Sequence, residues 1–240
     1  MVFLSVIIAA YNEEKRLPIT IEKLKEELEK RKIDYELIVA SDGSTDNTVE
    51  VAKKLGANSV RYKQNKGFTT ALRYGFNFAS GEVILNLAAD VDNFDFLDSL
   101  KHVKEVDVIS ISKRHPESVI TGYTFKRWLI SNTYHNIEKF LFGKLIATSD
   151  THFVTIYKRK VLEKVYPYCK SAHWGGETEA VVFAKYFGFT FMDVPIHITH
   201  KTLPTNIVKE AGVYWKTLLE LLNIKWRLIK MNKIDVKNGA

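Results

Sequence analysis

The residues most able to do chemistry in this sequence are carboxylates that stand directly after apolar runs. Asp42 follows the apolar run 37–40 and precedes Gly43, which permits a tight turn. In an open α/β sheet, ligands bind beyond the carboxyl ends of the strands, where a carboxylate can accept a hydrogen bond from a ring N–H. The polar segment 11–14 follows the run 6–10 in the same way. We interpret the two segments as loops of one binding site, although Asp-Gly-Ser is also common in ordinary turns.

A third apolar run, 83–87, is followed by two carboxylates, Asp90 and Asp92. In an extended chain, residues two apart lie on the same side, so both side chains could share a hard divalent cation such as Mg or Mn. A solvated acidic turn accounts for the same spacing. The metal site is therefore a hypothesis at this point.

Strands and helices alternate in the part of the chain that carries these residues. Apolar periodicity and turn residues predict strands over 4–9, 36–40, 59–62, 83–87 and 107–112, with helices over 18–31, 47–55 and 69–79. Such alternation favours an α/β fold with a mostly parallel sheet and helices on both faces.

Beyond Pro116 the order changes. We expect helices over 125–142, 160–165 and 177–186, and strands over 153–157 and 190–198. Neither an internal repeat nor a Pro/Gly-rich linker interrupts the chain. We therefore expect one domain over 1–205 and a C-terminal helix and tail over 206–240.

Composition and charge limit the class of protein. The 240 residues are enough for one sizeable α/β core, and 46% hydrophobic with 26% charged residues is typical of a globular protein. Cys169 is the single cysteine, so an internal disulfide is excluded. No apolar run reaches the roughly 18 residues of a membrane span, and the opening run, which lacks a basic segment, is read as a strand and not as a signal peptide.

The positive charge is concentrated near the C-terminus. From Lys201 onward there are eight Lys and Arg against three acidic residues, which gives +5 of the total +7. The predicted helix 206–231 has a polar stripe and a broad apolar one, a pattern typical of an interfacial helix on anionic lipid. The stripe consists of Lys216, Glu220, Asn223, Arg227 and Lys230. Packing of this helix on the domain or on a partner subunit stays open as an alternative. Nucleic acid is not expected as a partner, because no nucleic-acid-binding motif is present.

Four motifs in order resemble the family 2 glycosyltransferases of GT-A fold. They are 10–14 (Ala-Tyr-Asn-Glu-Glu), 42–46 (Asp-Gly-Ser-Thr-Asp), Lys66-Gly67 ahead of a helix, and Asp90 after a buried strand. The sequence is most similar to the polyprenyl-phosphate type, the dolichyl-phosphate mannose or glucose synthases. The resemblance covers about the first 115 residues well and the remainder loosely.

The resemblance implies a donor site for a UDP- or GDP-sugar. Asp42 would read the nucleotide base, with Tyr11 beside it. The implied nucleotide-sugar-binding residues are Ala10, Tyr11, Asn12, Glu13, Asp42, Gly43, Lys66, Gly67, Ala89 and Asp90. The implied metal is Mg or Mn, held by Asp90 and Asp92. The family's preceding Asp residues are replaced here by Ser41 and Ala88.

The resemblance also implies an acceptor site. Arg127 would bind phosphate, with Lys113 or Arg114 as a second cation. Glu177, Glu179 or Asp150 would serve as general base if the acceptor is a hydroxyl. The expected reaction is an inverting, metal-dependent transfer to a polyprenyl phosphate by a peripheral protein on the cytoplasmic membrane face. A glycan hydroxyl as acceptor, or a nucleotide-sugar-binding paralogue with little turnover, are the alternatives. A dinucleotide-binding oxidoreductase is disfavoured, because no Gly-x-Gly-x-x-Gly follows the first strand.

Overall fold

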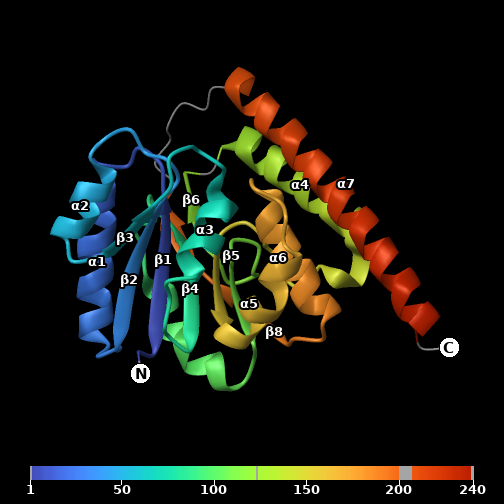
Figure 1. The fold of residues 1–240 in the computed structure, drawn as a ribbon, viewed down its shortest axis with the longest axis horizontal. Coiled ribbons are helices and arrows are strands. Elements are labelled where there is room, and N and C mark those ends of the chain that lie inside the picture. Colours follow the sequence, from blue (N-terminus) through green and yellow to red (C-terminus); the bar gives the residue numbers. More distant parts are fainter. Residues whose placement is uncertain (1, 123, 200–206, 239–240) are drawn as a thin grey trace.

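In the computed structural model, which describes residues 2–122, 124–199 and 207–238, a seven-stranded sheet has the order β3-β2-β1-β4-β7-β5-β8 (Figure 1). Its strands are β1 (Leu4–Ala10), β2 (Tyr35–Ser41), β3 (Asn58–Arg61), β4 (Val83–Ala88), β5 (Val108–Ser112), β7 (Val154–Lys158) and β8 (Phe191–Pro195). A two-stranded sheet pairs β6 (Val119–Thr121) with β9 (His197–Thr199). The helices are α1 (Leu17–Lys30), α2 (Thr48–Lys54), α3 (Phe68–Phe76), α4 (Phe125–Phe142), α5 (Arg159–Val165), α6 (Gly175–Tyr186) and α7 (Ile207–Asn238). Three 3₁₀ segments are η1 (Asp95–Lys104), η2 (Gly143–Leu145) and η3 (Tyr166–Tyr168).

The predicted mostly parallel α/β sheet is confirmed, with one inverted strand. β7 pairs antiparallel with β4 on one side and with β5 on the other, while the other neighbours in the sheet run parallel. The chain therefore enters β7 at the same edge where it leaves β4 and β5. This brings residues 148–153 to the end of the sheet that carries Asp42 and Asp90.

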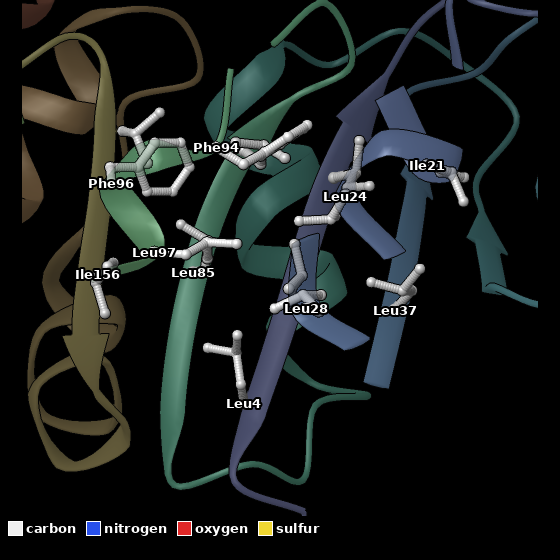
Figure 2. Packing of buried hydrophobic residues seen from close by; sticks show 14 of the residues in the cluster. Leu4, Ile21, Leu24, Leu28, Leu37, Leu85, Phe94, Phe96, Leu97 and Ile156 are labelled. Atoms are coloured by element: carbon white, nitrogen blue, oxygen red, sulfur yellow. The ribbon is translucent and has the colours of Figure 1, made fainter. Parts of the chain in front are cut away.

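Both faces of the sheet are buried, as β1 shows. Leu4, Val6 and Ile8 point to one face and pack in a cluster with Leu24 and Leu28 of α1 (Figure 2). The alternate residues of β1 belong to a second cluster on the other face, with α3, α5, α6 and α7. Burying each such side chain contributes about 1.5–3 kcal/mol, so the two clusters hold the strand ends rigidly under the site.

The single strand expected over 190–198 is wrong. The chain breaks into β8 and β9 at Pro195, and the two strands pair with β5 and β6 in different sheets. Ile196 between them donates its N–H to Ser118 Oγ at 3.0 Å and accepts from the backbone N–H of Val119. These bonds satisfy the backbone at the break. Two further elements, η1 and β6, were not predicted from the sequence.

Helix α7 packs on the domain, but not in the orientation expected for a helix with a solvated polar stripe. Its buried residues include Leu221, Ile224 and Leu228, which join the cluster formed with α4 and α6. An apolar stripe at helical spacing faces outward instead. It consists of Trp215 (63% exposed), Leu219 (49%), Leu222 (48%), Trp226 (54%) and Ile229 (44%).

The polar residues of α7 are divided between the two faces. Glu220 and Arg227, which were expected on a solvated stripe, bind groups of the domain, whereas Lys216 and Lys230 are exposed. The Nζ atom of Lys230 lies 3.5 Å from the centre of the Trp226 ring. Within the described residues, the search for membrane-spanning segments finds no helix with the length and apolarity to cross a bilayer.

Candidate active site

A cavity of about 540 Å³ opens beyond the carboxyl ends of β4 and β5. It is lined by residues of β4, α3, α4 and α6, and by the segments that follow β4 and β5 and precede β7. Its charged and titratable residues are Asp90, Lys113, Arg114, Lys126, Arg127, Tyr134, His135, Glu138, Asp150, His152 and Glu177. The cavity therefore combines several cations with carboxylates, an arrangement suited to phosphate groups and to a divalent cation.

Asp42 lies at the end of β2 and is 4% exposed. Its Oδ1 accepts hydrogen bonds from Tyr62 Oη (2.6 Å) and from the backbone N–H of Lys66 (2.7 Å), and its Oδ2 accepts from the N–H of Gly67 (2.9 Å). Hydrogen bonding to the Asp42 carboxylate contributes to raising the pKa of Tyr62, although burial is the larger cause. A carboxylate offers about four acceptor positions, so one remains for a ligand N–H.

The backbone around the Asp42 carboxylate requires glycine at positions 43 and 67. Both have positive φ, 74° and 103°. A Cβ at Gly43 would lie 2.6 Å from the Asn65 nitrogen, and a Cβ at Gly67 would lie 2.3 Å from the Ala172 carbonyl oxygen. Any side chain at these positions would push apart the segments that surround Asp42.

The segment after β1 is hydrogen-bonded to the segment after β2. Asn12, with φ of 56°, donates its N–H to Ser44 Oγ (3.1 Å) and accepts from the Thr45 N–H at Oδ1 (2.8 Å). The N–H of Glu13 donates to Thr48 Oγ1 at 2.8 Å. Tyr11 stays 46% exposed beside them. The structure thus brings the two predicted loops together, with an aromatic ring available for stacking.

Glu13 is connected to Asp90 through Arg16, which sequence reasoning missed. Arg16 Nε lies 3.2 Å from Glu13 Oε2, and its Nη1 lies 3.9 Å from Asp90 Oδ2. Burial raises the pKa of Glu13, and the Arg16 charge opposes that rise. Arg16 stands at the start of α1 with no motif around it, so only its position after the 11–14 loop could have indicated it.

The expected metal ligands differ in their placement. Asp90 lines the cavity and its side chain is 60% exposed, whereas Asp92 is not among the lining residues. Among the described residues, no group of three or more His, Cys, Asp and Glu side chains could hold a metal ion. One exposed carboxylate facing a cationic cavity still fits Mg or Mn, because these ions take most of their remaining ligands from water and substrate phosphates. Ala89, expected among the nucleotide-sugar-binding residues, is buried, and its carbonyl accepts from Thr20 Oγ1 at 2.7 Å.

The expected phosphate-binding cations lie around the same cavity. Arg127 comes from the first turn of α4, and Lys113 and Arg114 follow β5. Lys126, which was not predicted, lines the cavity beside Arg127. Asp150 lies 3.6 Å from Lys113 Nζ, through its Oδ2. These cations therefore approach one space from two different elements.

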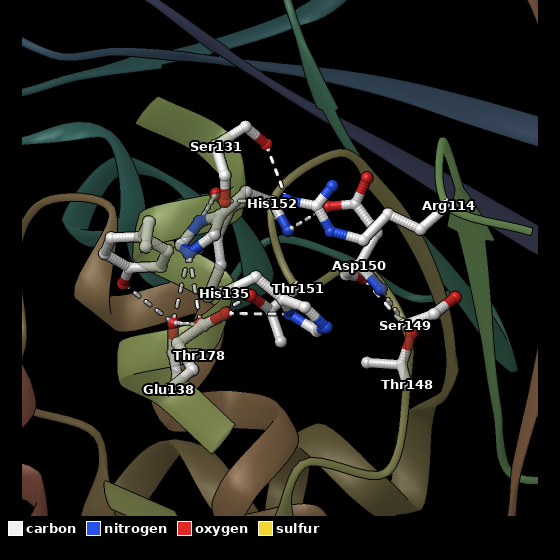
Figure 3. A network of polar contacts seen from close by, with 12 residues as sticks. Arg114, Ser131, His135, Glu138, Thr148, Ser149, Asp150, Thr151, His152 and Thr178 are labelled. Carbon is white, nitrogen blue, oxygen red and sulfur yellow. Dashed lines mark hydrogen bonds and ion pairs between the residues drawn. The ribbon is translucent and has the colours of Figure 1, made fainter. Parts of the chain in front are cut away.

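Arg114 is fixed in this space, because its Nη2 donates to the Ser131 carbonyl (2.6 Å) and to Ser131 Oγ (2.7 Å; Figure 3). Its Nε is buried and has no hydrogen-bond partner among the described residues, so this N–H is left for a bound anion.

A buried charge network lies beneath these cations (Figure 3). His152 has Glu138 on one side, with Nε2 3.3 Å from Oε1, and Glu177 on the other, with Nδ1 3.2 Å from Oε2. Burial alone would lower the pKa of His152, but the two carboxylates outweigh it and raise the pKa to about 10. Thr151 and Thr178 donate their hydroxyls to Glu138 Oε1, at 2.6 and 2.5 Å. His152 is therefore a permanent cation at neutral pH.

Of the expected general bases, Glu177 and Asp150 line the cavity and Glu179 does not. Glu177 lines the cavity, and burial raises its pKa. Glu179 is fully buried away from the cavity, where Oε2 accepts from the N–H groups of Lys170 (2.9 Å) and Ser171 (2.7 Å) and Oε1 contacts Arg227. The expectation for Glu179 is corrected because residues two apart on a helix point in different directions. His152 and Glu138 were missed, and their spacing in the sequence gives no signal.

Comparison with known proteins identifies the family of this chain. The sequence model of glycosyl transferase family 2 matches residues 5–166. The chain is 28% identical over 218 residues to the dolichyl-phosphate beta-glucosyltransferase of Homo sapiens and 30% identical over 218 residues to that of Drosophila melanogaster. Each match covers 82% of this chain and 67% of the relative.

A solved structure shares the fold at low sequence identity. Glucosyl-3-phosphoglycerate synthase from Mycobacterium tuberculosis, in complex with Mn²⁺, UDP-glucose and phosphoglyceric acid, has a TM-score of 0.69 at 16% identity. The match covers 93% of this chain and 79% of the solved one. Since the family model spans more than half of the chain, this protein belongs to glycosyltransferase family 2.

Proposed function

We propose that this glycosyltransferase moves a sugar from a UDP- or GDP-sugar to a polyprenyl phosphate. The observation that carries the proposal is the group of Lys113, Arg114, Lys126 and Arg127 around the cavity that also contains Asp90. A donor diphosphate and an acceptor phosphate both require neutralising charge in one space. The names of the relatives from Homo sapiens and Drosophila melanogaster point to the same acceptor class, with glucose as the sugar.

On the donor side, the free acceptor position of Asp42 and the exposed ring of Tyr11 suit the edge and the face of a nucleotide base. Asp90 would hold Mg or Mn together with the diphosphate. When bound, the metal neutralises charge on the leaving diphosphate. Arg16 contacts both Glu13 and Asp90, and we assign it to orienting these two carboxylates.

On the acceptor side, a lipid phosphate is already anionic at neutral pH and needs no general base. Arg127 can bind it through two parallel hydrogen bonds, and Lys113 lines the same cavity. Arg127 has two exposed aromatic neighbours in the first turn of α4: Phe125 is 74% exposed, Trp128 is 49% exposed, and their rings stack 5.7 Å apart. The acceptor would then attack the anomeric carbon from the side opposite the diphosphate, which inverts the configuration there.

We further propose that α7 places the enzyme peripherally on the cytoplasmic face of a membrane. Its outward stripe of Trp215, Leu219, Leu222, Trp226 and Ile229 would enter the interface, while Lys216 and Lys230 would meet anionic headgroups. In this arrangement residues 1–205 form the catalytic domain and 206–240 the membrane-facing helix and tail.

A second candidate acceptor is a sugar hydroxyl, with Glu177 as base. It is favoured by the position of Glu177 on the cavity and by its raised pKa. The two acceptors make different predictions for Glu177→Gln. Transfer to a lipid phosphate would keep substantial activity, whereas transfer to a hydroxyl would lose it.

The test is a transfer assay with radiolabelled UDP- and GDP-sugars, total lipid extract, and Mn²⁺ or EDTA. We expect label to enter the lipid phase only with the matching donor. Arg127→Gln should raise the KM for the lipid phosphate, while Lys139→Gln, an exposed position further along α4, should not. Absence of both transfer and donor hydrolysis with every donor would instead favour a binding paralogue without turnover.

A further inference from the structure

The side chain of Glu220 on α7 reaches across to the start of α6. Its Oε1 accepts from the backbone N–H groups of Ala172 (2.8 Å) and His173 (3.0 Å), and its Oε2 accepts from the N–H of Gly175 (3.1 Å). The N-cap residue of α6, Trp174, makes no capping bond with its own side chain. The first N–H groups of a helix need an external acceptor, and a carboxylate suits the positive end of its dipole. Glu220 thus caps α6 from a distant helix.

The approach is close enough to require glycine. A Cβ at Gly175 would lie 2.7 Å from Glu220 Oε2, and a Cβ at Gly176 would lie 2.2 Å from Thr69 Oγ1. The segment 170–175 is therefore held tightly between α7 on one side and the start of α3 on the other.

The same segment is hydrogen-bonded to the start of α3. The Thr69 N–H donates to the Ala172 carbonyl (3.1 Å), and Thr69 Oγ1 donates to the carbonyls of Ser171 (3.0 Å) and His173 (3.1 Å). Arg73 Nη1 donates to the Ser171 carbonyl at 2.7 Å. The position of segment 170–175 consequently fixes the position of the residues just before α3.

Those residues hold Asp42. The N–H groups of Lys66 and Gly67 donate to its two carboxylate oxygens, and Gly67 lies so close to segment 170–175 that a Cβ there would be 2.3 Å from the Ala172 carbonyl oxygen. A continuous path of direct contacts therefore runs from Glu220 through Ala172 and Thr69 to Asp42.

A second connection from α7 holds the other end of the segment. Arg227 contacts the buried Glu179, whose Oε2 accepts from the N–H groups of Lys170 and Ser171. Arg227 Nη1 also donates to the Tyr168 carbonyl at 2.6 Å. The segment 170–175 is thus attached to α7 at both ends.

We propose that Glu220 is a positioning residue of the donor site: by holding segment 170–175 against the start of α3, it keeps Asp42 and its neighbouring N–H groups in the geometry that binds a nucleotide. This inference rests on the proposed function, because it requires that Asp42 binds the donor base. It assigns to α7 a role inside the enzyme in addition to its outward apolar stripe.

The test measures UDP binding in the presence of Mn²⁺ by calorimetry for the full chain and for Glu220→Gln. The carboxamide keeps the size of the side chain but turns an N–H₂ group toward a backbone donor. We expect the Kd for UDP to rise between about two- and thirtyfold, the range of couplings carried through packed networks. Glu22→Gln, an exposed glutamate on α1, is the matched control and should leave the Kd unchanged.

The melting temperature separates positioning from stability alone. If Glu220→Gln melts earlier but binds UDP as tightly as the native chain, Glu220 is merely structural and the inference is wrong. Should Glu220→Gln not fold, Thr69→Val removes the next hydroxyl of the path without touching α7, and it must also weaken UDP binding. A native chain that does not bind UDP or GDP overturns the proposed function as well, whereas native binding with an unaffected variant overturns the inference alone.

Discussion

Replacing Glu138 with Gln should destabilise the protein strongly, because Glu138 is the buried counter-ion of a permanent cation. The residue is 1% exposed and lies 3.3 Å from His152 Nε2. Burial opposes its ionisation, but the hydrogen bonds from His135, His152 and Thr151 outweigh burial and lower its pKa to about 2. Gln keeps the size of the side chain and one acceptor oxygen while removing the charge.

The size of the effect follows from the shifted pKa values. A His152 pKa raised from 6.5 to about 10 corresponds to a net stabilisation of the charged ring by about 5 kcal/mol, after the opposing effect of burial. Removing one partner of a buried ion pair costs about 3–5 kcal/mol, so we expect a loss in that range for Glu138→Gln.

The pH dependence has a defined sign. Because the folded-state pKa of His152 is raised, its contribution is fully present below pH 6.5 and is lost as the pH rises through about 10. Because the Glu138 pKa is depressed, its contribution is present above pH 4.5 and is lost as the pH falls through about 2. The stability difference between the native chain and the variant should therefore be greatest between pH 4.5 and 6.5 and should shrink toward pH 10.

The assay is equilibrium urea unfolding at several pH values, with the His152 ring titrated by NMR in parallel. Glu105→Gln is the matched control: Glu105 also pairs with a histidine, His102, at 3.1 Å, but its side chain is 58% exposed. Such a surface pair should change the free energy of unfolding by less than about 1 kcal/mol. Equal losses for the two variants near pH 6, or a native His152 that titrates near its ordinary pKa, would refute the reasoning.

Three further predictions concern the ligands. Asp42→Ala should weaken nucleotide binding by about 1.5–3 kcal/mol in calorimetry, and it should lower the melting temperature because three internal donors lose their acceptor; unchanged affinity would remove Asp42 from the donor site. Asp90→Ala should abolish Mn²⁺-dependent transfer while Asp92→Asn retains part of it, since only Asp90 lines the cavity; equal activity of the native chain in EDTA would contradict this. Replacing Trp215 and Trp226 together with Ser should reduce co-sedimentation with anionic liposomes, and 1 M salt should weaken binding of the native chain by screening its basic residues; a variant that binds as well as the native chain would exclude this face of α7.

Much of the part of the site assigned to the donor could be predicted, because each motif there depends on residues next to it in the sequence. Each predicted loop there follows its own apolar strand, and parallel strands place all such loops at one edge of the sheet. Asn12, Asp42 and Gly67 accordingly lie where their motifs suggested. Helix boundaries differ by a few residues, as at α3, which begins at Phe68 and ends at Phe76.

The acceptor half depends on contacts between residues far apart in sequence, and these leave little local signal. Nothing near His152 in the sequence indicates that Glu138 and Glu177 enclose it. The sequence alone does not distinguish Glu177 from Glu179, yet only Glu177 lines the cavity. The orientation of α7 could not be predicted either, because the helix has apolar residues on two faces and could bury either face against the domain. The hydrogen bonds and ion pair of Glu220 and Arg227 fix which face is buried.

The inverted strand β7 has a consequence for how the chain folds during synthesis. β7 lies between β4 and β5 in the sheet, yet it is made only after β6 and α4. Until residues 154–158 have been synthesised, β4 has one unpaired edge, and the fully buried side chains of Ile84 and Leu85 lack that neighbour. The strands β1 to β4 can pair early, while the acceptor half must wait for β7 to enter between two strands already formed. A ribosome-bound chain stopped before Val154 should therefore expose the unpaired backbone N–H and C=O groups of one edge of β4. We expect the nascent protein to be most prone to aggregation at this stage of synthesis.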